Sequence, residues 1–156
     1  PGNLKNKEQL MKKLKLKREP ILVMIGGSRF GLTLANKLFR HINNFDEDFI
    51  FFGYTSNFSR ENIKAFEFKE NFLEYLKVSK GIITLAGYST LSEALIYKTP
   101  MLIFPIENHV EQLLNAFTIR DYSFIGSDKN IEESIKKFIE ARGLAPHSIY
   151  FPRFSP

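Results

Sequence analysis

The sequence predicts an α/β fold with a doubly wound parallel sheet and helices on both faces, and two features of the chain lead to this. Short apolar runs rich in β-branched residues and Phe, such as 21–25 and 49–52, are typical of strands that are buried on both faces. Longer stretches between them, such as 31–43, place apolar residues at helical spacing. Because such strands and helices alternate along the chain, the strands are expected to run parallel.

Turn-forming residues separate the predicted elements. Pro20 precedes the first strand, Gly53 closes the second, and Gly143 and Pro146 stop the last helix. Strands are expected at 21–25, 49–52, 65–68, 82–86, 101–104 and near Phe124, and helices at 31–43, 70–79, 90–98, 109–120 and 130–142. The chain then divides into a basic leader or linker over 1–19, one folded domain over 20–143, and a proline-rich tail over 144–156.

Length and composition set the class of protein. The 156 residues suffice for one domain, and 44% hydrophobic with 25% charged residues is a globular composition without an apolar run of membrane-spanning length. The chain has no cysteine, which excludes disulfides and thiolate metal sites and fits a cytoplasmic protein. It begins at Pro1 without a Met, so a piece of a longer protein is expected.

The net charge of +5 is concentrated in the leader. Residues 1–18 hold seven of the 22 Lys and Arg residues but one of the 17 acidic residues, so the remainder is near neutral. Such a run is typical of a solvated linker or a frayed helix. Contact of residues 5–18 with anionic lipid at the cytoplasmic face of a membrane is the alternative. Nucleic acid is not expected, because no aromatic residue lies between these lysines to stack on bases.

Three polar clusters follow predicted strands, where parallel sheets bind ligands at helix N-termini. The first, 26–31, is a glycine-rich turn with the sequence Gly26-Gly27-Ser28 at its start. Its glycines permit close approach by a phosphate or a sugar. A tight turn in which Ser28 caps the next helix is the alternative. The cluster matches neither a P-loop nor a G-x-G-x-x-G fingerprint.

The second cluster is Gly87-Tyr88-Ser89-Thr90-Leu91-Ser92-Glu93. Thr90 and Glu93 have the spacing of a capping box, in which each side chain binds the other's backbone N–H at a helix start. Alternatively, a phosphate binds the first N–H groups of the helix, and Glu93 accepts hydrogen bonds from two ribose hydroxyls. The two interpretations predict different consequences for a Glu93→Gln substitution.

The third cluster, 105–112, contains His109, Glu111 and Gln112. It is either a solvated loop that leads into a helix or a set of donors and acceptors for a sugar diol. No histidine has metal-binding spacing, so no metal site is expected. The three clusters together would suit the diphosphate, ribose and hexose of a nucleoside diphosphate sugar.

These blocks resemble a known family. Gly26-Gly27-Ser28, then 86–94, then Pro100-Met101-Leu102-Ile103-Phe104-Pro105 and 109–116 look like the donor-binding half of GT-B glycosyltransferases, over about residues 20–142. The resemblance is strongest to the family-28 type, which includes the bacterial lipid II N-acetylglucosaminyltransferases. It implies the Rossmann-like half of a GT-B fold and an inverting, metal-independent transfer from a UDP-sugar, with no cofactor.

The resemblance also implies the roles of individual residues. The glycine turn with Ser28 approaches the diphosphate, the helix start binds a phosphate, Glu93 binds the ribose, and the segment at Phe68 and Lys69 meets the uracil. The third cluster, with Glu111 and Gln112, binds the sugar hydroxyls. The nearest relatives have two glutamines at these positions, so Glu111 departs from their pattern and leaves N-acetylglucosamine in doubt as the transferred sugar. The implied donor-binding residues are Gly26, Gly27, Ser28, Phe68, Lys69, Gly87, Tyr88, Ser89, Thr90, Glu93, His109, Glu111 and Gln112.

The family's acceptor site and general base lie on an N-terminal domain that residues 1–20 cannot form. This chain is therefore expected to hold no catalytic residue and to need an acceptor half, in the same polypeptide or as a separate subunit. Two alternatives stay open. One is half of a UDP-N-acetylglucosamine 2-epimerase-like enzyme, and the other is a non-enzymatic, flavodoxin-like binding module.

Overall fold

The computed structural model describes residues 6–26, 28–67, 69–85, 87–106, 111, 112, 114, 115 and 123–141, and of Tyr88 its backbone alone. Its helices are α1 (Lys7–Lys13), α2 (Arg29–Phe39), the short 3₁₀ helix η1 (Ile42–Asn44), α3 (Phe72–Val78), α4 (Tyr88–Ile96) and α6 (Ile131–Ala141). Its strands are β1 (Ile21–Met24), β2 (Phe49–Phe52), β3 (Phe58–Arg60), β4 (Ile63–Phe66), β5 (Gly81–Thr84), β6 (Met101–Ile103) and β7 (Phe124–Ile125).

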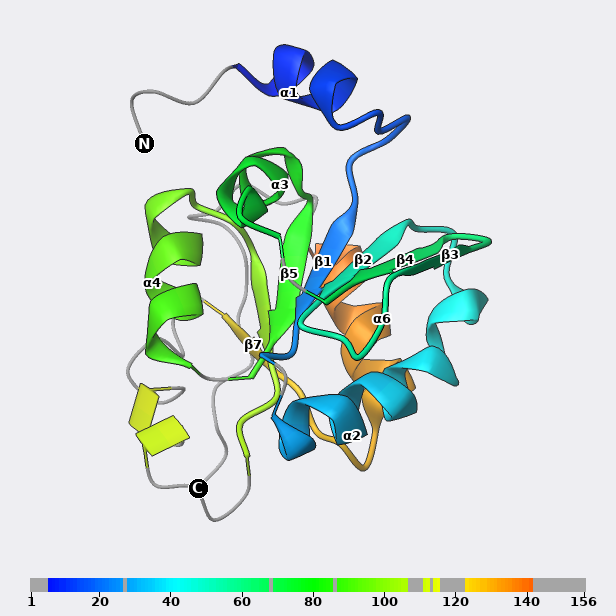
Figure 1. Cartoon of the computed structure of the whole chain (residues 1–156). Coiled ribbons are helices and arrows are strands. Elements are labelled where there is room, and N and C mark those ends of the chain that lie inside the picture. The colour runs from blue at the N-terminus through cyan, green and yellow to red at the C-terminus, as the bar shows by residue number, and fades with distance from the viewer. Residues whose placement is uncertain are drawn as a thin grey trace.

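One sheet organises the described residues, with the strand order β3-β4-β2-β1-β5-β6-β7 (Figure 1). All neighbouring strands pair in parallel except β3, which pairs antiparallel with β4 at the edge. Counted along the chain, the parallel strands lie in the Rossmann order 3-2-1-4-5-6 rather than the flavodoxin order 2-1-3-4-5. The predicted doubly wound sheet is confirmed, and its order reverses between β1 and β5.

Two apolar clusters cover the two faces of the sheet. The alternate residues Ile21 and Val23 of β1 face α2 and α6, whereas Leu22 faces α3 and α4. Period-two alternation along buried strands produces both surfaces, since successive side chains point to opposite faces. Helices therefore flank the sheet on both sides, as the sequence predicts, and α2, α4 and α6 begin at the carboxyl edge (Figure 1).

The predicted elements differ from the observed ones mainly at their ends. The third strand begins at Ile63 rather than near residue 65, and the polar hairpin strand β3 before it was not predicted. β3 has three residues and two of them are exposed, so it lacks the apolar run that identifies a strand. Of the predicted helix at 109–120, residues 111, 112, 114 and 115 are helical, and the others lie outside the described residues.

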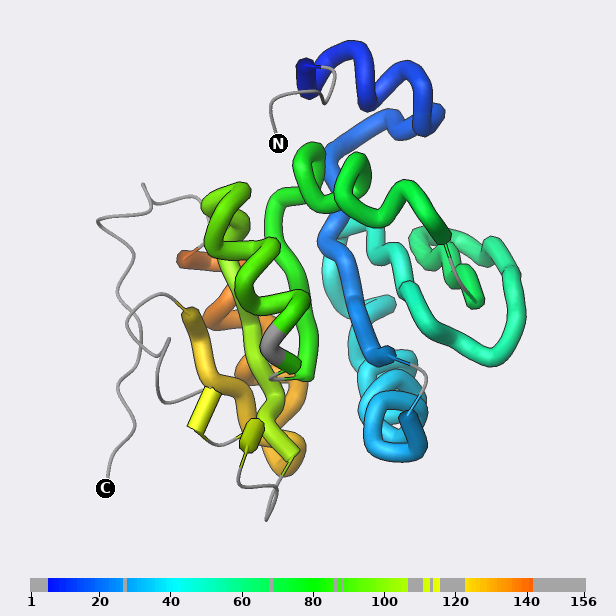
Figure 2. The backbone as a smooth tube through the Cα atoms, turned by 60° about the vertical axis from the view of Figure 1, so that its left-hand side comes forward, coloured from blue at the N-terminus to red at the C-terminus, as the bar shows by residue number. Residues whose placement is uncertain are grey.

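The leader contains a helix that packs on the domain. Asn6 and Gln9 form a capping box at the start of α1, and Leu10 is fully buried where α1 contacts α3. Lys13 Nζ lies 2.7 Å from Glu74 Oε1 on α3. Figure 2 shows α1 lying across the end of the domain beside α3. The frayed-helix alternative is therefore wrong for Lys7–Lys13, because burial of Leu10 holds this capped helix in place, whereas its charged residues are exposed as expected of a solvated segment.

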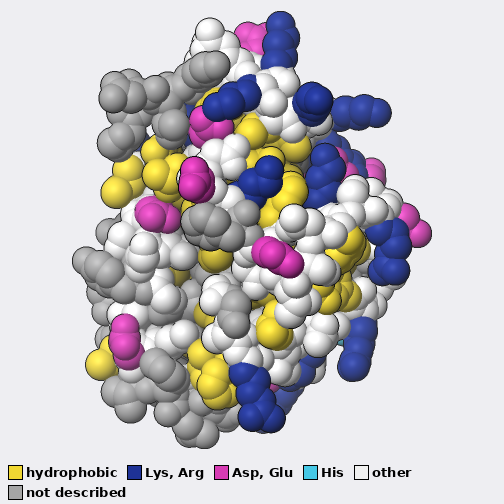
Figure 3. All heavy atoms as spheres, in the orientation of Figure 1, with side chains coloured by type: hydrophobic (Ala, Val, Ile, Leu, Met, Phe, Trp, Pro, Cys, Tyr) yellow, Lys and Arg dark blue, Asp and Glu magenta, His cyan; other side chains and the backbone are white. Residues whose placement is uncertain are grey.

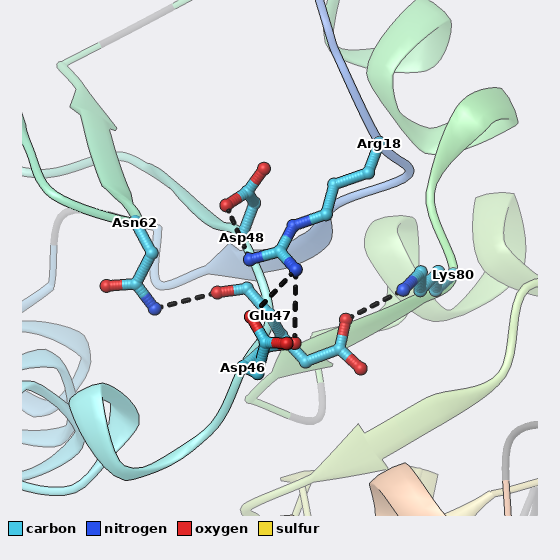
Figure 4. Close-up of polar contacts among 6 residues, drawn as sticks. All are labelled: Arg18, Asp46, Glu47, Asp48, Asn62 and Lys80. Carbon is cyan, nitrogen blue, oxygen red and sulfur yellow. Dashed lines mark hydrogen bonds and ion pairs between the residues drawn. The ribbon is translucent and has the colours of Figure 1, made fainter.

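An ion cluster at the amino edge of the sheet fastens the end of the leader to the domain (Figure 4). Arg18 bridges two carboxylates, with Nη1 2.9 Å from Asp46 Oδ1 and Nη2 3.0 Å from Asp48 Oδ1. Hydrogen bonds to Asp48 and Asp46 raise the pKa of Arg18 above its ordinary value. The buried Glu47 accepts from Lys80 Nζ at 2.8 Å, and its backbone carbonyl accepts from Asn62 at 2.7 Å. The residues around Arg18, just before β1, are thus held in place against the amino edge of the sheet.

Much of the basic charge of the leader is already paired. Lys7, Lys13 and Arg18 form ion pairs with carboxylates, whereas no ion pair of the described residues involves Lys12, Lys15 or Lys17. Lys and Arg side chains stand out at the upper end of the face in Figure 3, where α1 lies. Among the described residues, no helix is long and apolar enough to cross a membrane.

Candidate functional site

The carboxyl ends of β1 and β5 lie side by side where the strand order reverses. Met24 of β1 pairs with Thr84 of β5. The buried Thr84 side chain donates through Oγ1 to the backbone carbonyl of Met24 at 3.0 Å, in addition to the backbone ladder. Helices splay to opposite faces at such a point, and the crevice between their first turns is where open α/β sheets bind ligands.

The turn after β1 is tight for a clear steric reason. Gly26 has φ +69°, a left-handed conformation that glycine adopts readily, and a Cβ on it would meet nothing within 4 Å. Gly31, in the first turn of α2, has no such space, because a Cβ there would lie 1.9 Å from the backbone oxygen of Ile25. The glycines thus bring the start of α2 directly onto the end of β1 and leave the surface of the turn open.

Ser28 is the N-cap of α2, as one of the two sequence interpretations predicts. Its Oγ accepts from the backbone N–H of Gly31 at 3.0 Å. A hydroxyl that accepts one hydrogen bond still carries its own hydrogen, which can donate to a ligand oxygen. Capping by Ser28 is therefore compatible with contact to a ligand. Gly27 lies outside the described residues.

The helix after β5 begins two residues earlier than predicted, and this corrects the capping-box interpretation. α4 starts at Tyr88 with Gly87 as its N-cap, and no side chain of the described residues caps it. Thr90 is therefore inside the helix rather than at its cap, so it cannot form a capping box with Glu93. A bond from the N–H of Gly87 to the carbonyl of Leu85 at 2.9 Å turns the chain into the helix before Thr90 is reached. The first turn also carries no acidic residue, so the positive end of the helix dipole is unopposed there.

Glu93 lies in the second turn of α4 and is half-buried. Its Oε1 accepts from Ser89 Oγ at 3.5 Å, a long hydrogen bond between residues one turn apart on the helix. A Cβ on Gly87, at the start of the same helix, would meet nothing within 4 Å, so the helix start is open on that side. Gly87, Ser89, Thr90 and Glu93 thus share the first two turns of one helix at the reversal point.

A residue of the third cluster contacts the backbone that follows β6. Gln112 Oε1 accepts from the backbone N–H of Ile106 at 3.1 Å. Glu111 is exposed beside it, and His109 lies outside the described residues. Since β6 is the neighbour of β5 in the sheet, this loop lies next to the start of α4. The polar end of the Gln112 side chain therefore has a structural contact that the sequence did not indicate.

Lys69 lies farther from the reversal point between β1 and β5 than the other predicted residues. It follows β4, which is separated from β1 by β2, and its Nζ lies 4.5 Å from the centroid of the Phe66 ring. Phe68 lies outside the described residues. From β4 to β6 the edge spans four strand spacings, about 19 Å at the usual ~4.8 Å each. The structure thus brings together the predicted site residues that follow the neighbouring strands β1, β5 and β6. Lys69 lies at one end of this line of strand ends, after β4.

Two features of this site escaped the sequence analysis. Thr84 lies within an apolar strand, and nothing in its local pattern distinguishes its hydroxyl from a half-exposed strand threonine. The signal for Gly31 was present in the glycine-rich turn, but its steric role depends on the path of β1. Among the described residues, no group of three or more His, Asp and Glu side chains could hold a metal ion.

The comparison with protein families identifies this arrangement. The model of glycosyl transferase family 1 matches residues 7–142, which include α1 as well as the whole sheet. The chain belongs to glycosyl transferase family 1. The resemblance to glycosyltransferases with the GT-B fold is confirmed. Membership of a glycosyltransferase family favours a sugar-transfer enzyme over the epimerase-like and flavodoxin-like alternatives.

Individual relatives agree with this assignment. The chain is 31% identical over 101 residues to an uncharacterized glycosyltransferase of Methanopyrus kandleri, which covers 62% of the chain and 29% of the relative. It is 31% identical over 137 residues to the UDP-N-acetylglucosamine--N-acetylmuramyl-(pentapeptide) pyrophosphoryl-undecaprenol N-acetylglucosamine transferase of Thermosipho africanus, which covers 81% of the chain and 40% of the relative. The chain therefore spans less than half the length of these two relatives.

Crystal structures of glycosyltransferases share the fold. The glycosyltransferase SnogD of Streptomyces nogalater superposes with a TM-score of 0.60 at 17% identity, over 82% of this chain and 40% of SnogD. The glycosyltransferase VinC, in complex with DTDP, has a TM-score of 0.55 at 17% identity, over 79% of this chain and 34% of VinC. At this identity the likeness concerns the fold alone.

Proposed function

We propose that this family 1 domain binds the nucleotide-sugar donor, a UDP-sugar, of an inverting, metal-independent glycosyltransferase. The observation that carries the proposal is the start of α4, which lies at the reversal point of the sheet. Its first turn has no acidic residue, and no side chain among the described residues caps it. The first N–H groups of a helix have no partner within the helix. They and the helix dipole form an anion site.

The diphosphate occupies the crevice between the turn after β1 and the start of α4. The first backbone N–H groups of α4 and the hydroxyl of Thr90 donate to one phosphate. The hydroxyl of Ser89 joins them when it turns away from Glu93, to which it donates in the structure. Ser28 donates its hydroxyl hydrogen to the other while it continues to accept from Gly31. The glycines of both turns carry no side chain that would block this approach. A helix terminus contributes about 0.3–2 kcal/mol per charge, so several such donors are needed for useful affinity.

The remaining parts of the donor follow from this placement. Glu93 accepts two hydrogen bonds from the ribose hydroxyls, one turn beyond the phosphate. The uracil extends toward Phe68 and Lys69, which follow β4 at the carboxyl edge of the sheet. The hexose lies toward the loop after β6, where Glu111 accepts from its hydroxyls. A bond from Gln112 to the sugar would be donated by its amide nitrogen, since Oε1 accepts from Ile106.

The chemistry divides between this domain and an acceptor half. Transfer of the sugar develops negative charge on the departing UDP, and N–H groups aimed at the diphosphate stabilise that charge, a role that a divalent ion has in other enzymes. The general base that activates the acceptor hydroxyl belongs to the acceptor half. We therefore expect no transfer by this domain without that half, whether it is part of the same polypeptide or a separate subunit.

Calorimetric titration with UDP tests the proposal. Saturable binding is expected with a dissociation constant below about 1 mM, a binding free energy stronger than about −4.1 kcal/mol. The affinity should be the same in EDTA, and dTDP titrated in parallel measures the selectivity for uracil. A folded domain that does not bind millimolar UDP would overturn the proposal. An affinity that disappears in EDTA would overturn metal independence alone.

Membrane contact is a separate part of the proposal and rests on Lys12, Lys15 and Lys17. Their charges project from the leader, where a lysine near an anionic bilayer contributes about 1 kcal/mol. We expect sedimentation with phosphatidylserine vesicles at low salt, and its loss on Lys12→Glu, Lys15→Glu and Lys17→Glu together. Equal sedimentation of this triple variant and the wild type would overturn lipid contact through these lysines.

A further inference from the structure

An apolar pocket opens at the carboxyl edge of the sheet, on the face that α2 and α6 cover. Its volume is about 430 Å³, and six of the residues that line it are Phe30, Leu34, Leu85, Phe104, Pro105 and Ile106. Lys37, Asp128 and Lys129 add charged side chains to its lining. We call it the apolar edge pocket. Its volume is many times the ~30 Å³ that a water molecule occupies in the liquid, so it is a real opening and not a packing defect. Of the described residues to which the proposed function gives the donor, none lines it.

The rim of the pocket is formed by an exposed aromatic ring. Phe30 is 57% exposed in the first turn of α2. It stands four and eight residues before Leu34 and Leu38, which are buried on the sheet, so the three share one side of the helix. The apolar stripe of α2 therefore continues one turn beyond the part that the sheet covers. An exposed large apolar side chain beside an apolar pocket is typical of a protein interface.

The floor of the pocket is rigid. The Phe104 ring is 3% exposed and packs against Gly126, where a Cβ would lie 2.5 Å from Cε1 of the ring. The N–H of Gly126 donates to the carbonyl of Ile103 at 2.7 Å, which fixes the backbone under the ring. A preformed apolar depression of this kind can receive a side chain without reorganisation, which favours binding.

The pocket lies beside the proposed donor site. Phe30 is two residues after Ser28, Leu85 is two residues before Gly87, and the N–H of Ile106 is bound by Gln112. A group that reacts with the donor must approach to within about 3–3.5 Å of the sugar, so whatever carries the acceptor faces this same edge. The relatives are longer than this chain, which spans 29% of the Methanopyrus protein and 40% of the Thermosipho protein.

We propose that the apolar edge pocket, with Phe30 at its rim, is the docking site for the acceptor-carrying half of the enzyme. That half inserts a large apolar side chain between Phe30 and Phe104 and covers the uncovered turn of α2. This inference rests on the proposed function, since it takes the donor to be bound at the neighbouring turns. The contact would hold the two halves in register across the donor and would exclude water from the transferred sugar.

A photoreactive side chain at the rim identifies the occupant. Phe30→p-benzoylphenylalanine is prepared in the complete enzyme, with its acceptor-carrying half in the same or a separate polypeptide, and cross-linked peptides are sequenced by mass spectrometry. Cross-links from position 30 to the acceptor-carrying half are expected. Cross-links to residues 142–156 of this chain, cross-links to an acceptor molecule, or none at all would each overturn the proposal. The matched control is Ile96, which is 62% exposed at the far end of α4 and should not cross-link to that half.

A neutral substitution at the same position gives a second measurement. In the complete enzyme, Phe30→Ser should lower kcat/KM at least tenfold, while Ile96→Ser leaves it within twofold. The affinity of this domain for UDP should be the same in Phe30→Ser and wild type, because the ring does not contact the donor and the substitution adds no charge beside the diphosphate. Full activity of Phe30→Ser would overturn the docking site. Absence of UDP binding by the wild type would instead overturn the proposed function and leave the cross-linking result to stand on its own.

Discussion

Glu93→Gln separates a ligand role for this residue from a structural one. The structure removes the capping-box interpretation, since α4 begins at Tyr88. Among the described residues, Glu93 accepts one long hydrogen bond, from Ser89 Oγ at 3.5 Å. Folding should therefore change little, within the ~0.5 kcal/mol of an ordinary surface substitution. Binding should change much more. Hydrogen bonds to a charged group contribute about 1.5–3 kcal/mol each and neutral ones about 0.5–1.5. Loss of the carboxylate from a ribose diol should thus cost roughly 1.5–3 kcal/mol, a ten- to hundredfold weaker UDP affinity.

The assay compares two quantities on the same variants. Calorimetry gives the UDP dissociation constant, and thermal unfolding without ligand gives the stability. Glu140→Gln is the matched control, because Glu140 is an exposed helix glutamate on α6, far from the carboxyl-edge loops. A Glu93→Gln variant that binds UDP as tightly as wild type refutes the ribose role. One that unfolds several degrees earlier with unchanged affinity would show that Glu93 is a structural residue.

Three further predictions concern the scaffold of the site. Gly31→Ala should destabilise the fold by about 1–3 kcal/mol or more in urea unfolding, since its Cβ would lie 1.9 Å from the Ile25 oxygen; equal midpoints would contradict the tight turn. Thr84→Val should leave the Met24 carbonyl without its side-chain donor, lower stability by about 1–3 kcal/mol and weaken UDP binding; an unchanged affinity would separate this strand contact from the site. Leu10→Ala should cost about 2–5 kcal/mol, and an unaltered unfolding midpoint would mean that α1 folds independently of the sheet.

The sequence predicted the sheet better than it predicted the ends of the helices. Runs such as 49–52 are apolar throughout, so their burial on both faces leaves little choice of structure. The start of α4 is different, because Gly87, Ser89 and Thr90 are all acceptable N-cap residues. The choice among them depends on the turn that Gly87 makes with Leu85, a backbone contact that no side-chain pattern encodes. The predicted capping box failed for this reason.

The docked leader shows the same limit at a larger scale. The leader contains Leu10, Leu14 and Leu16 among its lysines, and the charge pattern suggested solvation. Leu10 is nevertheless fully buried, and Leu14 and Leu16 pack against the cluster beneath α3 and α4. Leucines spaced by four residues in a basic segment are thus also consistent with a helix that packs by one side. Which side is buried depends on α3, and the sequence of the leader alone does not contain that information.

The two helices at the reversal point explain why structural and ligand roles need not compete in this site. In α2, Ser28 satisfies the N–H of Gly31 by accepting, and its own hydroxyl hydrogen remains able to donate to a ligand. In α4, no side chain in the described part of the chain caps the helix, so its first N–H groups can take a partner from outside the helix. Both helix starts therefore present donors rather than acceptors to the crevice between them. A ligand rich in acceptors and carrying negative charge, such as a diphosphate, satisfies both at once, whereas a neutral or cationic ligand would leave the donors of α4 to water.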